Sequence, residues 1–270
     1  MILLLKIIFK DLYRILKSAH GFKFLMLILK FGGSGRFQKR EIKFNGLKFT
    51  VVDTLSFLWQ YKEIYVDGSY KFKTENSNPL IIDCGANVGT SVAFFKQCYP
   101  NSRIVAIEGN PEIAEILSLN IEKNSLTGVE VKSAAVWLHE GKIPMLLEAA
   151  DSSTISDSME ATEVNCIRLK DLLLSFKDRI DLLKIDIEGA ETKVLIDCSD
   201  ELDLVRNLFV EYHSFTKEEQ ELDKLLGVLK GSGFRVFIST VNSRREPFIN
   251  RNDEDNKPMD MQLNIYAYRD

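Results

Sequence analysis

The sequence predicts an α/β fold, in which a mostly parallel sheet carries helices on both faces. The apolar run at residues 80–82 ends on Asp83 and is followed by a glycine-containing loop and an amphipathic helix. A second apolar run, at residues 103–109, ends in Glu108 and is again followed by a helical pattern. Further apolar runs repeat the alternation, at residues 129–136, 180–191 and 205–213. Such alternation is typical of a parallel sheet whose carboxyl edge binds ligands.

The first unit has glycines at informative positions. Gly85 lets the backbone approach a ligand closely, and Gly89 lies where the helix begins and its free N–H groups point outward. The spacing is D-x-G-x-N-x-G, with Ala86 and Asn87 between the glycines, and not the dinucleotide pattern G-x-G-x-x-G. It resembles motif I of class I S-adenosylmethionine (AdoMet) methyltransferases, and AdoMet carries a carboxylate and an ammonium that suit a helix N-terminus beside Asp83. These five residues are therefore expected to bind AdoMet, and a purely structural strand–loop–helix is the alternative.

The second unit places an acid one strand further along the sheet. Glu108 at the end of this strand is positioned to accept hydrogen bonds from both ribose hydroxyls, as acids do in dinucleotide sites. Asn110 is a good N-cap for the next helix, and Pro111 takes its first position. We expect Glu108, Gly109 and Asn110 to belong to the cofactor site; a solvated loop acid is the alternative for Glu108.

The third apolar run is interpreted as a single strand over residues 129–136. By position, Ala135 and Val136 would lie near the adenine ring, where small residues let a flat ring stack. Short strands at residues 142–149 and 164–169 flank a long, polar, serine-rich loop, and such loops are often functional lids. Within it, Ser152, Ser153 and Thr154 either bind cofactor or substrate or are solvated, and solvation is favoured for at least two of the three.

The best catalytic candidates lie at residues 180–191. Apolar residues alternate there with Lys184, Asp186 and Glu188, and Gly189 ends the expected strand. Strand periodicity would put the three charged side chains on one face, and burying charge is unfavourable unless it serves a site. A structural ion-pair network is the alternative. Asp186 and Glu188 would suit Mg²⁺, but they are also explained without a metal, and no metal is predicted.

A histidine ends the next strand, at residues 205–213. Of the three histidines, only His213 falls at the carboxyl end of an expected core strand, where an imidazole can exchange a proton near neutral pH. A hydrogen-bonded structural histidine is the alternative. After it come an amphipathic helix at residues 217–230 and two last strands, at residues 235–239 and 261–269.

The chain begins with two segments that precede the expected catalytic domain at residues 79–270. Residues 1–35 form an amphipathic, basic helical segment whose lysines interrupt any apolar run of the roughly 18 residues that could span a bilayer. Residues 1–30 either lie on an anionic membrane surface or pack on protein, including a second subunit of a homodimer; packing on protein is favoured. Residues 36–78 form a cap with a β-hairpin around Asn45-Gly46. The aromatic residues after the hairpin line a substrate mouth or, as we favour, seal the cap against the core.

Composition narrows the class of protein. The chain has 270 residues, is 45% hydrophobic and has a net charge of −4, and no basic patch interleaved with aromatic residues appears in the catalytic part. A nucleic-acid substrate is therefore disfavoured. Four cysteines without a C-x-x-C pair indicate reduced thiols and a cytoplasmic protein, either free or peripheral at the inner membrane surface.

The motifs together resemble one family. DCGANVG, then Glu108-Gly109-Asn110-Pro111, then LKIDIEGAE, then VEYH are similar to the FkbM-type AdoMet-dependent methyltransferases, over residues 79–239. The usual acid-Pro-Asn-Pro turn differs here at Gly109. The resemblance implies a Rossmann-like class I methyltransferase sheet of seven strands, the last of them antiparallel. It also implies methyl transfer to a hydroxyl of a sugar, glycan or polyketide-like small molecule.

Direct in-line transfer is the expected mechanism. His213 or Asp186 would accept the proton of the acceptor hydroxyl, while Lys184 and Glu188 orient the base or the substrate. Two other functions remain open. One is an N- or C-directed methyltransferase acting on a small molecule or protein, and the other is a non-catalytic, membrane-associated AdoMet-binding scaffold.

Overall fold

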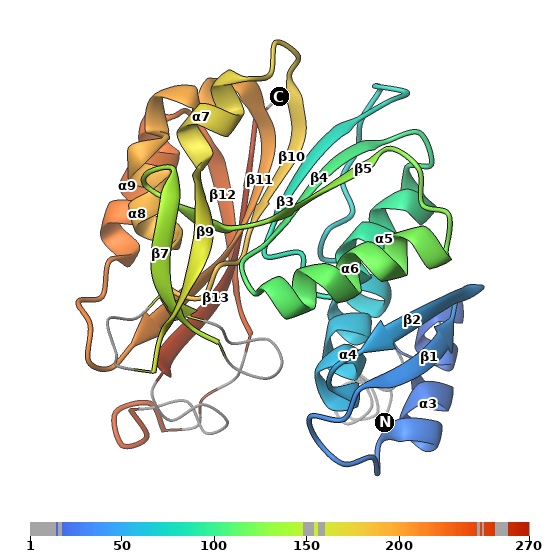
Figure 1. The fold of residues 1–270 in the computed structure, drawn as a ribbon. Coiled ribbons are helices and arrows are strands. Elements are labelled where there is room, and N and C mark those ends of the chain that lie inside the picture. Colours follow the sequence, from blue (N-terminus) through green and yellow to red (C-terminus); the bar gives the residue numbers. More distant parts are fainter. Residues whose placement is uncertain are drawn as a thin grey trace, which may run out of the picture.

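A central sheet with helices on both faces forms the body of the protein (Figure 1). The computed structural model describes residues 15, 18–147, 154–155, 160–241, 244, 246–251 and 259–269. The loop residues Ser152 and Ser153 and the first 14 residues therefore lie outside the described part. Of Thr154, only the backbone is described, in a short strand.

The central sheet has seven strands. In spatial order they are β12 (Arg235–Thr240), β13 (Met259–Tyr268), β11 (Val205–Phe215), β10 (Ile180–Ile185), β3 (Leu80–Cys84), β4 (Arg103–Glu108) and β5 (Val129–Ser133). Neighbouring strands from β11 to β5 are parallel, and β13 is antiparallel to both β11 and β12. The predicted α/β class, with seven strands and the last antiparallel, is confirmed. The carboxyl ends of β3, β4, β10 and β11 consequently meet at one edge.

Helices bury both faces of this sheet. Alternate residues point to opposite sides, so Ile81 and Ala106 join one apolar cluster while Ile82 and Leu183 join the other. The first cluster is covered by α5 (Thr90–Cys98) and α6 (Pro111–Lys123). The second is covered by α7 (Leu169–Leu174), α8 (Glu191–Asp197) and α9 (Leu222–Gly231), with the 3₁₀ helix η2 (Ser199–Leu204) between the last two. All six residues of β10 are buried because this strand is covered on both sides.

The single strand expected at residues 129–136 is two strands in the structure. β5 ends at Ser133, and β6 (Ala135–Trp137) pairs instead in a separate four-stranded sheet. Its strand order is β6, β9 (Thr162–Arg168), β7 (Gly141–Leu146) and β8 (Thr154–Ile155). Between the two strands, the Ala134 N–H donates a hydrogen bond to the Glu108 carbonyl of β4 at 3.0 Å. No glycine or proline marks the change of sheet, so the apolar pattern runs through it.

The strand expected to continue to Gly189 is also shorter. β10 ends at Ile185, and Glu188 and Gly189 have φ values of +54° and +98° in the turn that precedes α8. Strand periodicity therefore does not explain where Glu188 lies. The helix predicted from residue 217 likewise begins later, at Leu222.

The N-terminal segments pack directly on the catalytic body. β1 (Arg40–Phe44) and β2 (Leu47–Val51) form the predicted hairpin, and the turn residues Asn45 and Gly46 both have positive φ. They are accompanied by α3 (Ala19–Phe31), α4 (Thr54–Tyr61) and the π-helix η1 (Lys62–Asp67). The Asn120 side chain of α6 bonds the backbone N–H and C=O of Thr50, at 2.7 and 2.9 Å.

The aromatic residues after the hairpin form the seal that we favoured. Tyr61 and Tyr65 are buried, and the Tyr65 ring meets Phe94 of α5 edge-on, with centroids 5.2 Å apart. Trp59 is the exception, since it is 62% exposed and borders the cavity described below.

Two further expectations concern the chain as a whole. None of the described helices is both long and apolar enough to cross a bilayer. Cys84, Cys166 and Cys198 are buried, as expected of small apolar side chains, and Cys98 is exposed.

Candidate active site

A cavity of about 390 Å³ opens at the carboxyl edge of the central sheet. Residues at the ends of β3, β4, β10 and β11 line it, together with residues of β6, β7, β13 and the cap. Its volume is within the usual range for small-molecule sites. The cavity lies where open α/β sheets bind their ligands.

Seven of the residues predicted to bind the cofactor line this cavity. They are Gly85, Ala86, Asn87, Glu108, Gly109, Ala135 and Val136. The other three do not line the cavity but lie next to residues that do. Gly89 is the N-cap of α5, Asn110 caps α6 by accepting from the Glu112 N–H, and Asp83 is fully buried. The Asp83 carboxylate accepts a 2.5 Å hydrogen bond from Ser91 Oγ, so it is an internal anchor of the loop.

Glu108 is held in one orientation by backbone N–H groups. Its Oε2 accepts from Asn87 N and its Oε1 from Asn110 N, both at 2.9 Å. Burial raises the pKa of this carboxyl, although the two hydrogen bonds act in the opposite direction. Each oxygen keeps a further lone pair, which is the arrangement that a ribose diol requires. With the apolar wall at Ala135 and Val136 on the same cavity, the residues present fit AdoMet.

Gly85 also has a structural reason to be glycine, besides the expected approach to a ligand. Its φ is +82°, and a Cβ atom there would lie 1.8 Å from the carbonyl oxygen of Asp186. The close approach is thus between two parts of the chain. It brings the β3 loop against the end of β10, where the Asp186 N–H also bonds the Cys84 carbonyl at 3.1 Å.

Lys184 joins the same two segments through charge. Its Nζ lies 3.2 Å from Asp83 Oδ1 and 3.3 Å from Asp186 Oδ2, and donates to the Gly85 carbonyl at 2.9 Å. Burial disfavours charge on this amine, but the carboxylates of Asp186 and Asp83 outweigh it and raise its pKa. Lys184 therefore carries a buried positive charge that orients Asp186.

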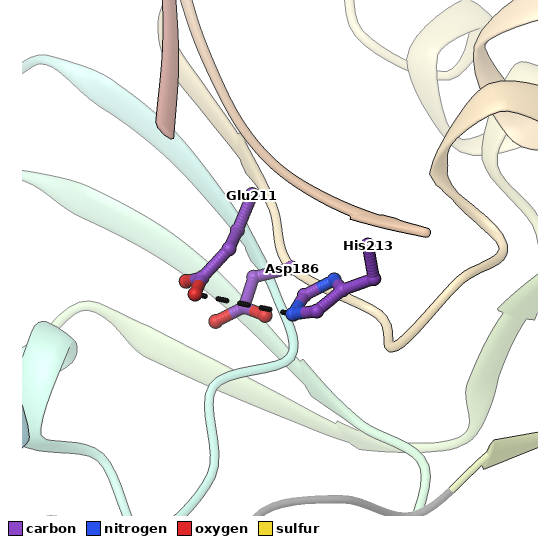
Figure 2. Close-up of side chains that lie close together, drawn as sticks. All are labelled: Asp186, Glu211 and His213. Carbon is purple, nitrogen blue, oxygen red and sulfur yellow. Dashed lines mark ion pairs between the residues drawn. The ribbon is translucent and has the colours of Figure 1, made fainter. Parts of the chain in front are cut away.

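His213 lies beside the same carboxylate. Asp186 directly follows β10 and His213 lies on the neighbouring strand β11, and Figure 2 shows them converging with Glu211. Glu211 and His213 are two residues apart on β11, so both point to the same face. His213 Nε2 is 3.9 Å from Glu211 Oε1 and 3.8 Å from Glu188 Oε2. All four residues predicted to be catalytic thus border one cavity. Glu188 reaches it from the turn after β10.

The charges around His213 decide its protonation. Burial disfavours the imidazolium, but the carboxylates of Glu188, Glu191 and Glu211 outweigh burial and raise the pKa of His213 well above its usual value. Burial and the nearby Asp186 raise the pKa of Glu211 as well. The acids around His213 therefore favour its protonated form.

The cluster also has the spacing that a cation would need. Asp186, Glu211 and His213 each offer one ligand atom, and these atoms lie within 4.8 Å of one another. A divalent ion could take the space between them, but a protonated His213 would supply positive charge at the same place. The prediction that the protein uses no metal remains to be tested.

Several residues of the site were not predicted from the sequence. Glu211 could have been found, because it precedes His213 by two residues on one strand face. Glu63 of η1 and Gln262 of β13 line the cavity from distant parts of the chain, and no local pattern points to either. Glu63 Oε1 accepts a 2.8 Å hydrogen bond from Asn264 Nδ2, which ties the cap to β13.

Comparisons with known proteins found similarity to methyltransferases. The model of the methyltransferase FkbM domain matches residues 83–236. Methyltransferase sdnD of Sordaria araneosa is 30% identical over 207 residues, which span 63% of this chain and 80% of that protein. Methyltransferase 1 of Beauveria bassiana is 29% identical over 204 residues, or 66% and 81% of the two chains. The crystal structure of methyltransferase FkbM from Methylobacillus flagellatus aligns with a TM-score of 0.49 and 14% identity, over 80% of this chain and 52% of that one.

Proposed function

Because this chain belongs to the FkbM family of AdoMet-dependent methyltransferases, we propose that it methylates a hydroxyl oxygen of a sugar, glycan or polyketide-like small molecule. One observation carries the proposal. Asp186 and His213 come from adjacent strands and border the cavity that also contains the residues predicted to bind AdoMet. A carboxylate and a cationic imidazole at one point suit an acceptor that must lose a proton as it reacts.

Asp186, Lys184 and His213 each have a separate role in the proposed methyl transfer. AdoMet, when bound, supplies a methyl group already activated on a sulfonium. Asp186 accepts the proton of the acceptor hydroxyl, because the surrounding acids favour the protonated form of His213, which cannot act as the base. Lys184 keeps the Asp186 carboxylate oriented at 3.3 Å, and His213 donates a hydrogen bond to the acceptor. The cap closes over the sheet edge and limits the entry of water.

The remaining lining supports a hydroxyl-rich acceptor. Gln60 and Glu63 reach the cavity from the cap, and Gln262 reaches it from β13. The two amides both donate and accept hydrogen bonds and the carboxylate accepts them, as an acceptor with several hydroxyls requires. The exposed indole of Trp59 offers an apolar face at the rim, on which the ring of an acceptor can pack.

Amine methylation is the second candidate, since carboxylates crowd the cavity. Glu63, Glu188 and Glu211 would attract a cationic amine. An amine must be neutral to attack a methyl group, however, and neighbouring carboxylates favour its protonated form. A hydroxyl is already neutral, so the same carboxylates do not hold it in an unreactive protonated form. This difference favours oxygen as the acceptor atom.

The experiment is to identify the atom that receives the methyl group. The protein is incubated with AdoMet carrying a ¹³C-labelled methyl group and with separate glycan, lipid, small-molecule and protein extracts. Carbon NMR of the product then distinguishes O-methyl from N-methyl and C-methyl groups, and resistance of the label to base distinguishes an ether from an ester. We expect a base-stable O-methyl ether. A product labelled on nitrogen or carbon would reject the proposal.

A further inference from the structure

The side of His213 that faces away from the cavity contacts a buried carboxylate. Glu191 begins α8, is 1% exposed, and its Oε1 lies 3.0 Å from His213 Nδ1. The same carboxylate accepts hydrogen bonds from the backbone N–H groups of Ile187 and Gly189, at 3.1 and 3.0 Å. Glu191 is thus fixed by the turn between β10 and α8 and is not free to follow the imidazole.

This contact settles which ring nitrogen carries hydrogen. An ionised carboxylate can only accept, so Nδ1 must be the donor whether His213 is neutral or charged. Nε2 then points to the other side, where Gln262 Nε2 lies at 3.4 Å and Glu188 Oε2 at 3.8 Å. The imidazole is therefore held with one defined nitrogen toward the cavity.

We propose that Glu191 is a positioning residue that fixes His213 as a hydrogen-bond donor aimed at the methyl acceptor. The role given to His213 rests on the proposed function, whereas the pairing itself does not. Glu191 does not line the cavity, so it acts on the site indirectly, through His213 and through the turn whose N–H groups it accepts from. Buried carboxylates are known to fix the tautomer and orientation of functional histidines in this way.

The charged groups around the imidazole all act in one direction. Glu191 faces it from α8, Glu188 from the turn after β10, Glu211 from its own strand, and Asp186 lies within 4.8 Å. Each is an acid, and each favours the imidazolium. His213 is therefore charged below its raised pKa and loses this charge only as the pH rises through that value.

Glu191 differs from the other three acids in its geometry. It is the one with a hydrogen-bond contact to Nδ1, at 3.0 Å, and it is the most deeply buried of the four. Replacing Glu191 with glutamine removes the charge but keeps an oxygen that can accept from Nδ1. Replacing it with alanine removes both, so the two variants separate charge from orientation.

The test uses the small number of histidines in the chain. Protein labelled with ¹⁵N-histidine contains only His20, His139 and His213, and the signal lost in His213→Asn assigns His213. We expect a wild-type His213 with hydrogen on Nδ1 at every pH and the highest pKa of the three. In Glu191→Gln, its pKa should fall by about one unit or more while the Nδ1–H tautomer persists. In Glu191→Ala, the Nδ1–H preference should be lost as well.

Glu188→Gln is the matched control. It removes an acid 3.8 Å from Nε2, so the pKa of His213 should fall while hydrogen stays on Nδ1. Thermal unfolding and AdoMet calorimetry show whether each variant is folded. If Glu191→Ala does not fold, the His213 pKa measured in Glu191→Gln still tests the proposal. An unchanged His213 pKa and an unchanged tautomer in the folded Glu191 variants would overturn the proposal.

Kinetics supply the second readout. In Glu191→Gln, the alkaline limb of the kcat profile should move to lower pH, because His213 loses its proton earlier, and the KM for AdoMet should stay within about threefold. A uniform loss at every pH would indicate a structural role and contradict the inference. The NMR experiment needs no acceptor. If it gives the expected result but no hydroxyl is ever methylated, only the proposed function is wrong.

Discussion

Replacing Glu108 tests the assignment of the methyl-donor site most directly. Its two carboxylate oxygens are each oriented by one backbone N–H at 2.9 Å and keep one lone pair for a ribose hydroxyl. Hydrogen bonds to a charged group contribute about 1.5–3 kcal/mol each, and part of this is offset when water replaces the partner. For Glu108→Ala we therefore expect AdoMet binding to weaken by about 1–3 kcal/mol, or about 5- to 150-fold in Kd.

The same change also affects folding. The N–H groups of Asn87 and Asn110 lose their acceptor. This lowers the free energy of unfolding by about 1–3 kcal/mol for each N–H group that water does not reach. Calorimetry with AdoMet must therefore be paired with thermal unfolding. Glu112→Ala is the matched control, because Glu112 lies in the first turn of α6, is exposed, and carries the same charge. Unchanged AdoMet affinity in a folded Glu108→Ala protein would refute the ribose assignment.

The pKa of Glu108 adds a dependence on pH. Burial raises it, so the carboxylate is lost, and AdoMet affinity falls, at a higher pH than for an ordinary glutamate. Glu108→Gln should remove this dependence. An affinity that is flat across the acidic range in the wild type would contradict the argument.

Four further outcomes are expected. Asp186→Asn should lower kcat by about 10²–10⁴ and leave the Kd for AdoMet within tenfold, and normal turnover would show that Asp186 is not the proton acceptor. Trp59→Ala should raise the KM for the acceptor by about three- to tenfold without changing AdoMet affinity, and an unaffected KM would remove the indole from the acceptor site. A chelator should leave turnover unchanged, and a loss restored by Mg²⁺ would assign a metal to the cluster in Figure 2. If α3 lies on a membrane surface, its exposed apolar residues Phe22, Met26 and Leu29 should make the protein co-sediment with anionic vesicles at low salt, and Leu29→Glu should prevent this; a wild type that stays in solution would reject membrane contact and leave packing on protein, which we favour.

The two strands whose ends were predicted wrongly from the sequence share one cause of error. The segment at residues 129–136 changes sheets between Ser133 and Ala135 with no glycine or proline to mark the change, and its apolar residues continue from the partly buried β5 into the buried start of β6. At Glu188, strand alternation was extended into a turn, because a charged residue two positions after Asp186 continues the period of a strand. Periodicity reports which side of a segment is buried, but not which partner strand buries it.

The residues of the site also divide into those that the sequence pattern predicts and those that only the packing reveals. Asp186 and His213 could be paired from the sequence, because both end core strands and the carboxyl ends of parallel strands meet at one edge. The pairing of His213 with Glu191 could not, because that contact depends on how tightly the chain turns between β10 and α8. Glu63 and Gln262 are likewise recognised only once the cap and β13 are packed on the sheet edge.

The sequence by itself determined the order of strands and helices, the family, and the residues at the edge of the sheet. These follow from local patterns, since alternation, caps and glycine spacing act over a few residues. Only the tertiary structure decided the chemical state of those residues. The proton on His213 and the charge on Lys184 depend on carboxylates that come from several different segments. Electrostatic interactions act through space, and distance along the chain does not predict them.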